Sequence, residues 1–319
     1  MSQAEAAGEC QAAPRATRRV SGGDAMLFLC VLTWSVNVSV VKILLGHYPP
    51  FVLAALRVCE ALLGFAVVLL LRRESIGVRL RDLPLLVAAG LIGIFMNQFC
   101  FVYALRLAHA SSVALLLSMI PVFVVITAAV LGVADLSKWA LAGIPISVFG
   151  VLMIIATEPG NQLSLGSLSG NIFAIGTSLS WAVYTVIIQP LLKRYSVAKI
   201  SVYVLLVGLV ALAPAALAGA HGPSPAAVPW WAWLLVVFSG LGAIFATNFL
   251  WYIGTHRLGP ARGSLYAFLQ PFLGALAAVV ILADAVNPLE VVGGAVVIAG
   301  IIMARREKPA ATELAAPGE

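Results

Sequence analysis

Arg57 and Glu60 are charged residues inside the long apolar run 51–71. They lie three residues apart, so on a helix they face the same side. If this run crosses a bilayer, an ionised group near its centre costs at least about 2.5–3.5 kcal/mol. The pair therefore has either a function, as a gate or a proton-coupled carboxylate, or a structural role, as a salt bridge that lets both groups be buried. Glu60 is the one carboxylate well inside an apolar run, so any proton coupling depends mainly on it.

Amide and aromatic side chains recur in the other apolar runs, mostly three or four residues apart. Amides and hydroxyls hydrogen-bond polar solutes, while aromatic rings form apolar walls. The alternative is that these groups only hydrogen-bond and pack between helices. Because the set occurs in both halves of the chain, we expect it to line a shared substrate cavity. The set consists of Trp34, Asn37, Asn97, Gln98, Trp181, Tyr184, Asn248, Trp251, Tyr252, Tyr266 and Gln270.

Pro121 and Pro271 each lie within an apolar run. A proline inside a helix removes one backbone hydrogen bond and frees a carbonyl group. The two residues are therefore candidate hinges for a conformational change, and the alternative is a fixed kink.

The sequence gives little support for a nucleotide, cofactor or metal site or for enzymatic catalysis. It has no glycine-rich phosphate loop with a lysine, and its four histidines are scattered, so we expect no nucleotide, cofactor or metal site. The cysteines at 10, 30, 59 and 100 follow no metal-ligand spacing and are interpreted as free thiols. We find no catalytic pair near a loop, which disfavours an enzyme acting on lipid-linked substrates.

The composition requires a membrane. Apolar residues make up 62% of the 319 residues, charged residues 10%, and the mean hydropathy is +1.05. Soluble domains carry about 25% charged residues. The pI near 9.4 does not indicate nucleic-acid binding, because the basic residues sit between apolar runs and form no stripe. The direct partners are therefore membrane lipid and a small-molecule substrate.

Ten apolar runs are long enough to be candidate spanning helices, which need about 20 residues. They are 25–46, 51–71, 83–105, 109–133, 138–156, 169–190, 197–219, 229–253, 261–283 and 287–304. Proline pairs or charged stretches separate them, and several connections are only a few residues long. The fold class is thus an all-α membrane protein of ten transmembrane helices.

Positive charge alternates along these runs. With ten spans, one side of the membrane receives both termini and every second loop. It holds sixteen of the nineteen basic residues, from Arg15 to Lys308, whereas Lys42 and Arg106 lie opposite and Arg57 lies within a span. Since basic loops stay in the cytoplasm, both termini are expected there. Lys42 is expected to extend outward to the interface.

The chain also contains an internal repeat. At an offset of 147 residues Trp34 falls on Trp181, and at an offset of 150 Pro121 falls on Pro271 and Gly143 on Gly293. Each half has five spans, so the second half must enter the membrane from the other side. We therefore expect two inverted five-helix repeats, with the substrate site near the midplane between them.

Several motifs together resemble the drug/metabolite transporter superfamily, within it the EamA-type ten-helix exporters. They are Trp34 followed by Asn37, Arg57 after PPFVLAAL, the segment FVYALRLAHASSVALL with Pro121 following, and Gly143 to Gly150 before VLM. Members often carry Glu after the fourth and ninth helices, where this chain has Asp135 and Asp284. Both lie at helix ends, so we expect an altered loop contact and unchanged transport chemistry.

The resemblance implies an exporter of amino acids or related metabolites in a bacterial inner membrane, working by alternating access. A passive channel is the alternative, and protons are a candidate coupling ion. The expected divisions are a cytoplasmic tail, a first repeat, a second repeat and a second cytoplasmic tail, at residues 1–24, 25–157, 169–305 and 306–319. Both a monomer and a homodimer are compatible with the sequence.

Overall fold

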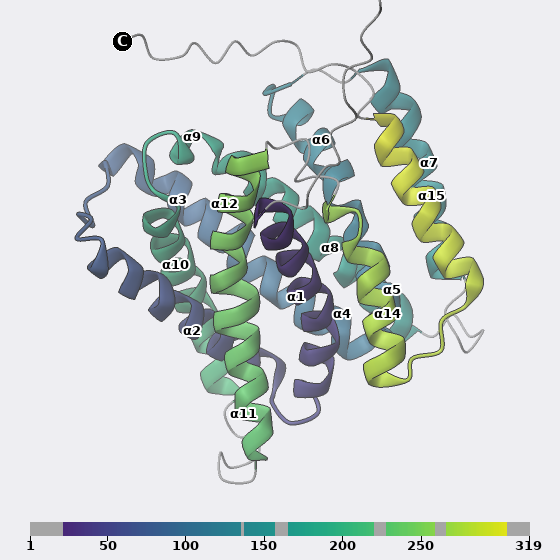
Figure 1. The fold of residues 1–319 in the computed structure, drawn as a ribbon, viewed down its shortest axis with the longest axis horizontal. Coiled ribbons are helices and arrows are strands. Elements are labelled where there is room, and N and C mark those ends of the chain that lie inside the picture. Colours follow the sequence, from purple (N-terminus) through teal and green to yellow (C-terminus); the bar gives the residue numbers. More distant parts are fainter. Residues whose placement is uncertain (1–21, 135–136, 157–164, 220–227, 259–265, 305–319) are drawn as a thin grey trace, which may run out of the picture.

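The computed structural model describes residues 22–134, 137–156, 165–219, 228–258 and 266–304. These residues form helices and no strand (Figure 1). Asp135 and the expected tail 306–319 lie outside the described residues, and of the expected tail 1–24 only residues 22–24 are described.

The first half contains five long helical segments. Two of them are interrupted: the third contains a π-helical stretch, and the fourth a short 3₁₀ turn before Pro121. In order, the elements are α1 (Gly22–Leu44), α2 (Pro50–Leu71), η1 (Leu80–Asp82), α3 (Leu83–Gly90), η2 (Leu91–Met96), α4 (Asn97–Leu107), α5 (Ala110–Leu116), η3 (Leu117–Met119), α6 (Ile120–Val130) and α7 (Lys138–Ala156).

The second half repeats this plan with shorter final helices. Its elements are α8 (Leu165–Ile187), α9 (Gln189–Leu192), α10 (Val197–Ala218), α11 (Trp230–Val237), η5 (Phe238–Ala246), α12 (Thr247–Leu258), α14 (Gln270–Leu282) and α15 (Pro288–Ala304). The π-helical stretches η2 and η5 occupy the third segment of each half. Such stretches are rare and frequently occur at functional sites.

Local chemistry fixes several helix ends. Pro50 is the first residue of α2, where its missing N–H needs no acceptor. Ser196 precedes α10, and its Oγ accepts a hydrogen bond from Lys199 N at 3.2 Å. Arg73 follows α2 with a φ of 51° and so reverses the chain before the next segment.

The described residues include eight helices long and apolar enough to cross a bilayer. The chain is therefore a multi-pass membrane protein. The other two apolar helices are shorter. Helix α14 has 13 residues, fewer than a spanning helix needs, and α15 has 17, at the lower limit for spanning. The expected span 261–283 begins in residues 261–265, which are outside the described part.

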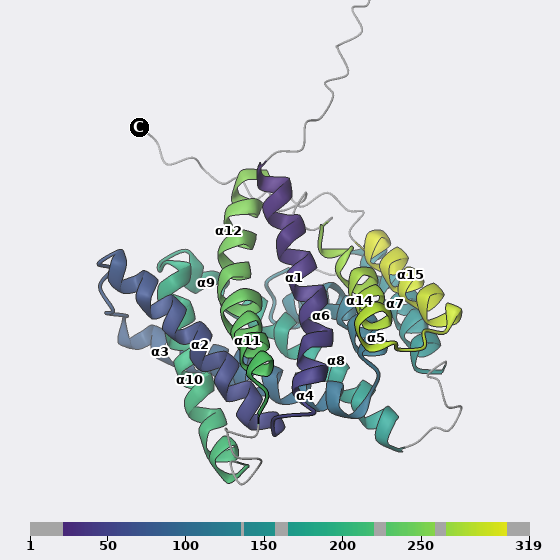
Figure 2. The ribbon, with the colours of Figure 1, turned by 60° about the horizontal axis from the view of Figure 1, so that its bottom comes forward.

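Helices α7 and α15 pack against each other at one side of the bundle, as both ribbon views show (Figures 1 and 2). Small residues allow this close approach: Gly150 faces the Gly293 carbonyl group, and Gly143 faces the Gly300 carbonyl group. Between these contacts Ser147 Oγ donates to Val297 O at 3.1 Å. Helix α1 contacts α12 and α14.

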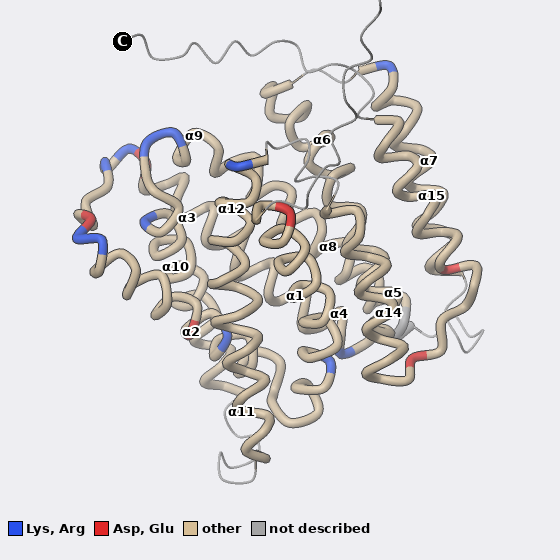
Figure 3. Tube along the Cα trace, in the orientation of Figure 1, with Lys and Arg blue, Asp and Glu red and all other residues tan. Residues whose placement is uncertain are grey.

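Basic residues gather at one end of the bundle, around α9 and the connection between α2 and η1 (Figure 3). We call this the basic end. There Arg194 Nη1 binds Asp82 Oδ1 at 2.6 Å, and Tyr195 Oη donates to Asp82 Oδ2 at 2.7 Å. The opposite end carries Trp230, Trp231 and Trp233 at the start of α11.

Candidate functional site

Two adjoining cavities lie between the halves. The smaller one, which we call the inner cavity, has a volume of about 160 Å³. Its polar lining comes from α1, α2, α4, α8, α12 and α14, and consists of Trp34, Asn37, Arg57, Asn97, Gln98, Thr177, Trp181, Asn248 and Gln270.

The second cavity, the vestibule, has a volume of about 610 Å³, within the range of small-molecule sites. Trp34, Trp181, Asn248 and Gln270 line both cavities, so the two adjoin at these side chains. The vestibule also reaches Gln189 and Leu192 of α9 and Val197 of α10, next to the basic end.

A hydrogen-bonded chain fixes the wall of the inner cavity beside α2. Arg57 Nε donates to Ser239 Oγ at 2.6 Å, and Arg57 Nη1 donates to Gln98 Oε1 at 2.9 Å. Ser239 Oγ in turn donates to Asn37 Oδ1 at 2.5 Å. The chain links α1, α2, α4 and η5, and it orients the guanidinium group and both amides.

Equivalent contacts position the two tryptophan-bearing helices. Trp34 Nε1 donates to Thr247 Oγ1 at 2.9 Å and to Ala243 O at 3.0 Å, which attaches α1 to η5 and α12. Asn97 Nδ2 donates to Thr177 O at 3.0 Å, which attaches α4 to α8. Thr247 is 150 residues after Asn97, so these two residues occupy corresponding positions of the two halves. One attaches to α1 and the other to α8.

Glu60 packs beside the inner cavity without lining it. Its Oε2 lies against the backbone of Gly240 in η5, where a Cβ would meet Glu60 Cβ at 2.8 Å and Arg57 O at 2.9 Å. This oxygen is buried and has no hydrogen-bond partner among the described residues. Among the described residues Glu60 forms no direct ion pair with Arg57, because the guanidinium group turns toward acceptors on two other elements, Ser239 of η5 and Gln98 of α4.

Most of the candidate substrate-binding residues lie in one place. The inner cavity or the vestibule is lined by Trp34, Asn37, Asn97, Gln98, Trp181, Tyr184, Asn248, Trp251, Tyr252 and Gln270. Tyr266 is the exception, because it is absent from both linings and its Oη donates to Asp24 Oδ1 at 2.8 Å. That bond joins the segment before α14 to the start of α1.

Pro121 and Pro271 both line the vestibule. Each is the second residue of a helix, α6 and α14, and not a helix-interior residue as expected. Both segments break just before the proline, and the missing N–H falls where no intrahelical partner is needed. The two helix breaks thus lie beside the vestibule.

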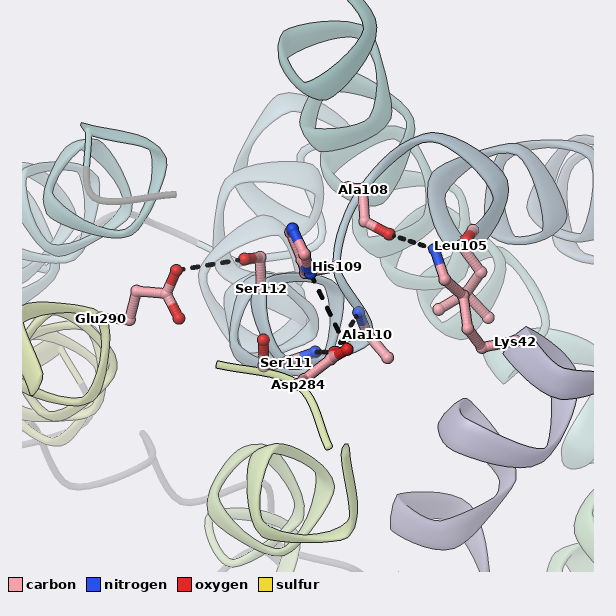
Figure 4. Close-up of polar contacts among 9 residues, drawn as sticks. All are labelled: Lys42, Leu105, Ala108, His109, Ala110, Ser111, Ser112, Asp284 and Glu290. Carbon is pink, nitrogen blue, oxygen red and sulfur yellow. Dashed lines mark hydrogen bonds and ion pairs between the residues drawn. The ribbon is translucent and has the colours of Figure 1, made fainter. Parts of the chain in front are cut away.

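At the end opposite the basic end, polar contacts surround the connection between α4 and α5 (Figure 4). Lys42 Nζ donates to Leu105 O at 2.5 Å and Ala108 O at 2.7 Å, at the end of α4. Lys42 therefore does not extend outward as expected, because the free carbonyl groups of a helix end attract a cation.

Asp284 holds the other side of this connection. Its Oδ2 accepts from Ala110 N at 3.1 Å and Ser111 N at 3.4 Å, at the start of α5, and its Oδ1 lies 3.8 Å from His109 Nδ1 (Figure 4). The carboxylate thus caps a helix N-terminus.

Ser239 and Thr247 are residues of the site that the sequence analysis missed. Both are short hydroxyl side chains in apolar surroundings, which usually bond to the preceding turn of their own helix. Their partners Arg57 and Trp34 are about 200 residues away in the chain. The one signal for Thr247 is its correspondence with Asn97 in the repeat.

Comparison with known proteins places the chain in a family. The EamA-like transporter family matches it twice, at residues 21–156 and 168–306. A probable terminal-alkyne amino-acid exporter of Streptantibioticus cattleyicolor is 29% identical over 88% of this chain and 92% of its own. A probable amino-acid metabolite efflux pump of Salmonella typhimurium is 25% identical over 86% of this chain and 92% of its own.

A solved crystal structure shares the fold, with a TM-score of 0.61 at 24% identity over 89% of this chain and 96% of that chain. The two family matches together cover most of the sequence and most of the helices described above. The protein is therefore a transmembrane transporter of small molecules and not an enzyme, and it belongs to the EamA-like transporter family.

Proposed function

We propose that the protein is a secondary transporter that exports amino acids or related small metabolites across a bacterial inner membrane. The printed names of the two relatives, an amino-acid exporter and an amino-acid metabolite efflux pump, support this direction and substrate class. The observation that carries the proposal is the cavity between the halves, where Trp34 and Trp181 occupy corresponding positions. The binding residues are the ten lining side chains named above.

In this proposal the chain crosses the membrane ten times as two inverted repeats, 25–157 and 169–305. Close packing at two corresponding glycines supports it. A Cβ added at Gly90 would meet Val207 Cβ at 2.6 Å, and a Cβ added at Gly240 would meet Glu60 Cβ at 2.8 Å. Gly240 follows Gly90 by 150 residues, and Val207 follows Glu60 by 147. The bond from Ser147 to Val297 also joins positions 150 apart.

Both termini face the cytoplasm in this arrangement, because the basic end then lies on the cytoplasmic side. The vestibule consequently opens inward, and the contacts of Lys42 and Asp284 close the external side. An inward-facing state with a closed external gate is one of the two states that alternating access requires. The inverted repeats would supply the other by exchanging conformations.

Solute counterflow in proteoliposomes tests the proposed function. Vesicles are loaded with an unlabelled amino acid, purine or drug, and uptake of the same labelled compound is measured with and without a pH gradient. We expect at least one amino acid to show transient accumulation, the mark of a carrier. Equilibration without accumulation would support the passive channel instead, and no movement of any solute would refute transport of these classes.

Replacing Asp284 by asparagine should loosen the external gate. A neutral amide caps the N-terminus of α5 less strongly than a carboxylate, by about 0.3–1 kcal/mol, enough to increase an outward-open population severalfold. Double electron–electron resonance between spin labels at Gly46 and Leu289 should reveal an added longer distance. Glu74→Gln, at the basic end, is the control. Identical distance distributions for all three proteins would exclude Asp284 from the gate.

A further inference from the structure

Arg57 is a buried cation on the wall of the transport cavity. Only 2% of its surface is exposed, and it is the largest of the fully buried side chains in the described residues. Its guanidinium group lies 5.5 Å from the centre of the Phe101 ring, and both residues line the inner cavity. A charge in such a place is costly unless an interaction compensates it.

The hydrogen-bond partners of this guanidinium group are all neutral. Ser239 and Gln98 accept two of its N–H groups, and Glu60 forms neither a hydrogen bond nor an ion pair with it in the described structure. A guanidinium group has five N–H donors, so three remain for another acceptor. One N–H on each Nη atom is among these three, and such a pair can bind a carboxylate in bidentate geometry.

The remaining lining of the inner cavity suits a particular anion. Its described lining contains no aspartate or glutamate, so Arg57 is the charged side chain of that lining, and the carboxylate of Glu60 lies beside the cavity without lining it. Trp34, Trp181 and Phe101 form apolar walls, and Asn97 and Asn248 offer amide groups. The chemistry matches a small solute with one carboxylate, an apolar side chain and a second polar group.

The geometry points to Arg57 as the residue that binds the substrate carboxylate, so that the inner cavity selects small amphipathic carboxylic acids, with amino acids among them, over amines. This inference rests on the proposed transport function and specifies its substrate class. It gives the guanidinium group a binding role in place of a structural salt bridge with Glu60.

Competition in the counterflow assay tests the inference with the natural protein. The labelled solute is the amino acid that exchanges fastest, and the competitors are L-phenylalanine, 3-phenylpropionate and 2-phenylethylamine. The second lacks the amino group and the third lacks the carboxylate. We expect both acids to inhibit at concentrations about tenfold or more below that of the amine, because a charge-assisted hydrogen bond to a buried guanidinium group strengthens binding by about that factor.

A variant pair assigns this preference to Arg57. Lysine keeps the positive charge but loses the bidentate fork, so Arg57→Lys should weaken inhibition by 3-phenylpropionate about tenfold and leave weak inhibition by 2-phenylethylamine unchanged. Arg106→Lys, an exposed position at the end of α4, is the matched control and should change neither. If Arg57→Lys does not yield a folded protein, equal inhibition by the acids and the amine in the natural protein still refutes the inference.

The outcomes distinguish a failure of the carboxylate site at Arg57 from a failure of the proposed transport function. Counterflow with equal inhibition by acid and amine, or with unchanged acid inhibition in a folded Arg57→Lys protein, refutes the carboxylate site and leaves transport standing. Absence of counterflow for every solute refutes the proposed function, and the inference with it.

Discussion

The Glu60→Gln protein should exchange solute in counterflow but lose all acceleration of transport by a pH gradient. Glutamine has nearly the shape of glutamate and can make the same contact with Gly240, but it cannot bind or release a proton in this pH range. Glu60 is the carboxylate that lies beside the inner cavity, and its Oε2 is buried without a hydrogen-bond partner in the described structure. A buried carboxylate in a spanning helix is a typical proton carrier.

The measurement compares uptake into proteoliposomes at equal pH and under an imposed gradient, for the natural protein and for Glu60→Gln. Glu74→Gln is the matched control, since Glu74 bonds to Ser196 Oγ at the basic end, away from the cavity. It should retain the full response to the gradient. A Glu60→Gln protein that responds like the natural one would rule out coupling through this group.

Leucine at Gly150 should destabilise the protein strongly. A Cβ there would meet Gly293 O at 2.6 Å, Val297 N at 2.7 Å and Val297 Cγ2 at 2.8 Å. Two of these atoms belong to the backbone of α15, so the helices must separate to admit any side chain. Overpacking of this kind costs about 1–3 kcal/mol, and more when backbone moves, so the thermal midpoint in detergent should fall by about 5 °C or more.

The control lies on the same helix. Val148→Leu adds a methylene group at a position of α7 that is 43% exposed, and its midpoint should stay within about 1 °C of the natural protein. Thermal unfolding followed by intrinsic fluorescence compares the three proteins. Equal midpoints for Gly150→Leu and the natural protein would show that α7 and α15 do not pack as closely as described.

Much of the site could be predicted from residue type and helical spacing. Amides and tryptophans in an apolar run cannot face lipid without cost, so their type indicates an internal face. Spacing then places Trp34 with Asn37 on one side of a helix, and the repeat pairs Trp34 with Trp181. These arguments do not require knowing which helices pack against one another. Ten of the eleven candidate binding residues line the cavities.

The details that could not be predicted depend on how each helix is rotated and shifted against distant neighbours. Spacing placed Arg57 and Glu60 on one face, but the acceptors on η5 and α4 determine where the guanidinium group turns. Tyr266 binds Asp24, which lies 242 residues away, and Lys42 binds carbonyl groups exposed by the end of α4. Neither contact has a local pattern in the sequence. The π-helical stretches η2 and η5 likewise arise in apolar segments with an ordinary helical composition.

Labelling of a single cysteine at Asn248 tests most directly whether the cavity is the transport pathway. Asn248 lines both the inner cavity and the vestibule. The substitution Asn248→Cys is made in a protein whose native cysteines are replaced and whose counterflow is intact, and a membrane-impermeant thiol reagent is applied to either side. We predict faster reaction from the basic end, slower reaction in the presence of the transported amino acid, and loss of counterflow after labelling. Labelling that is unaffected by the amino acid and leaves counterflow intact would contradict it.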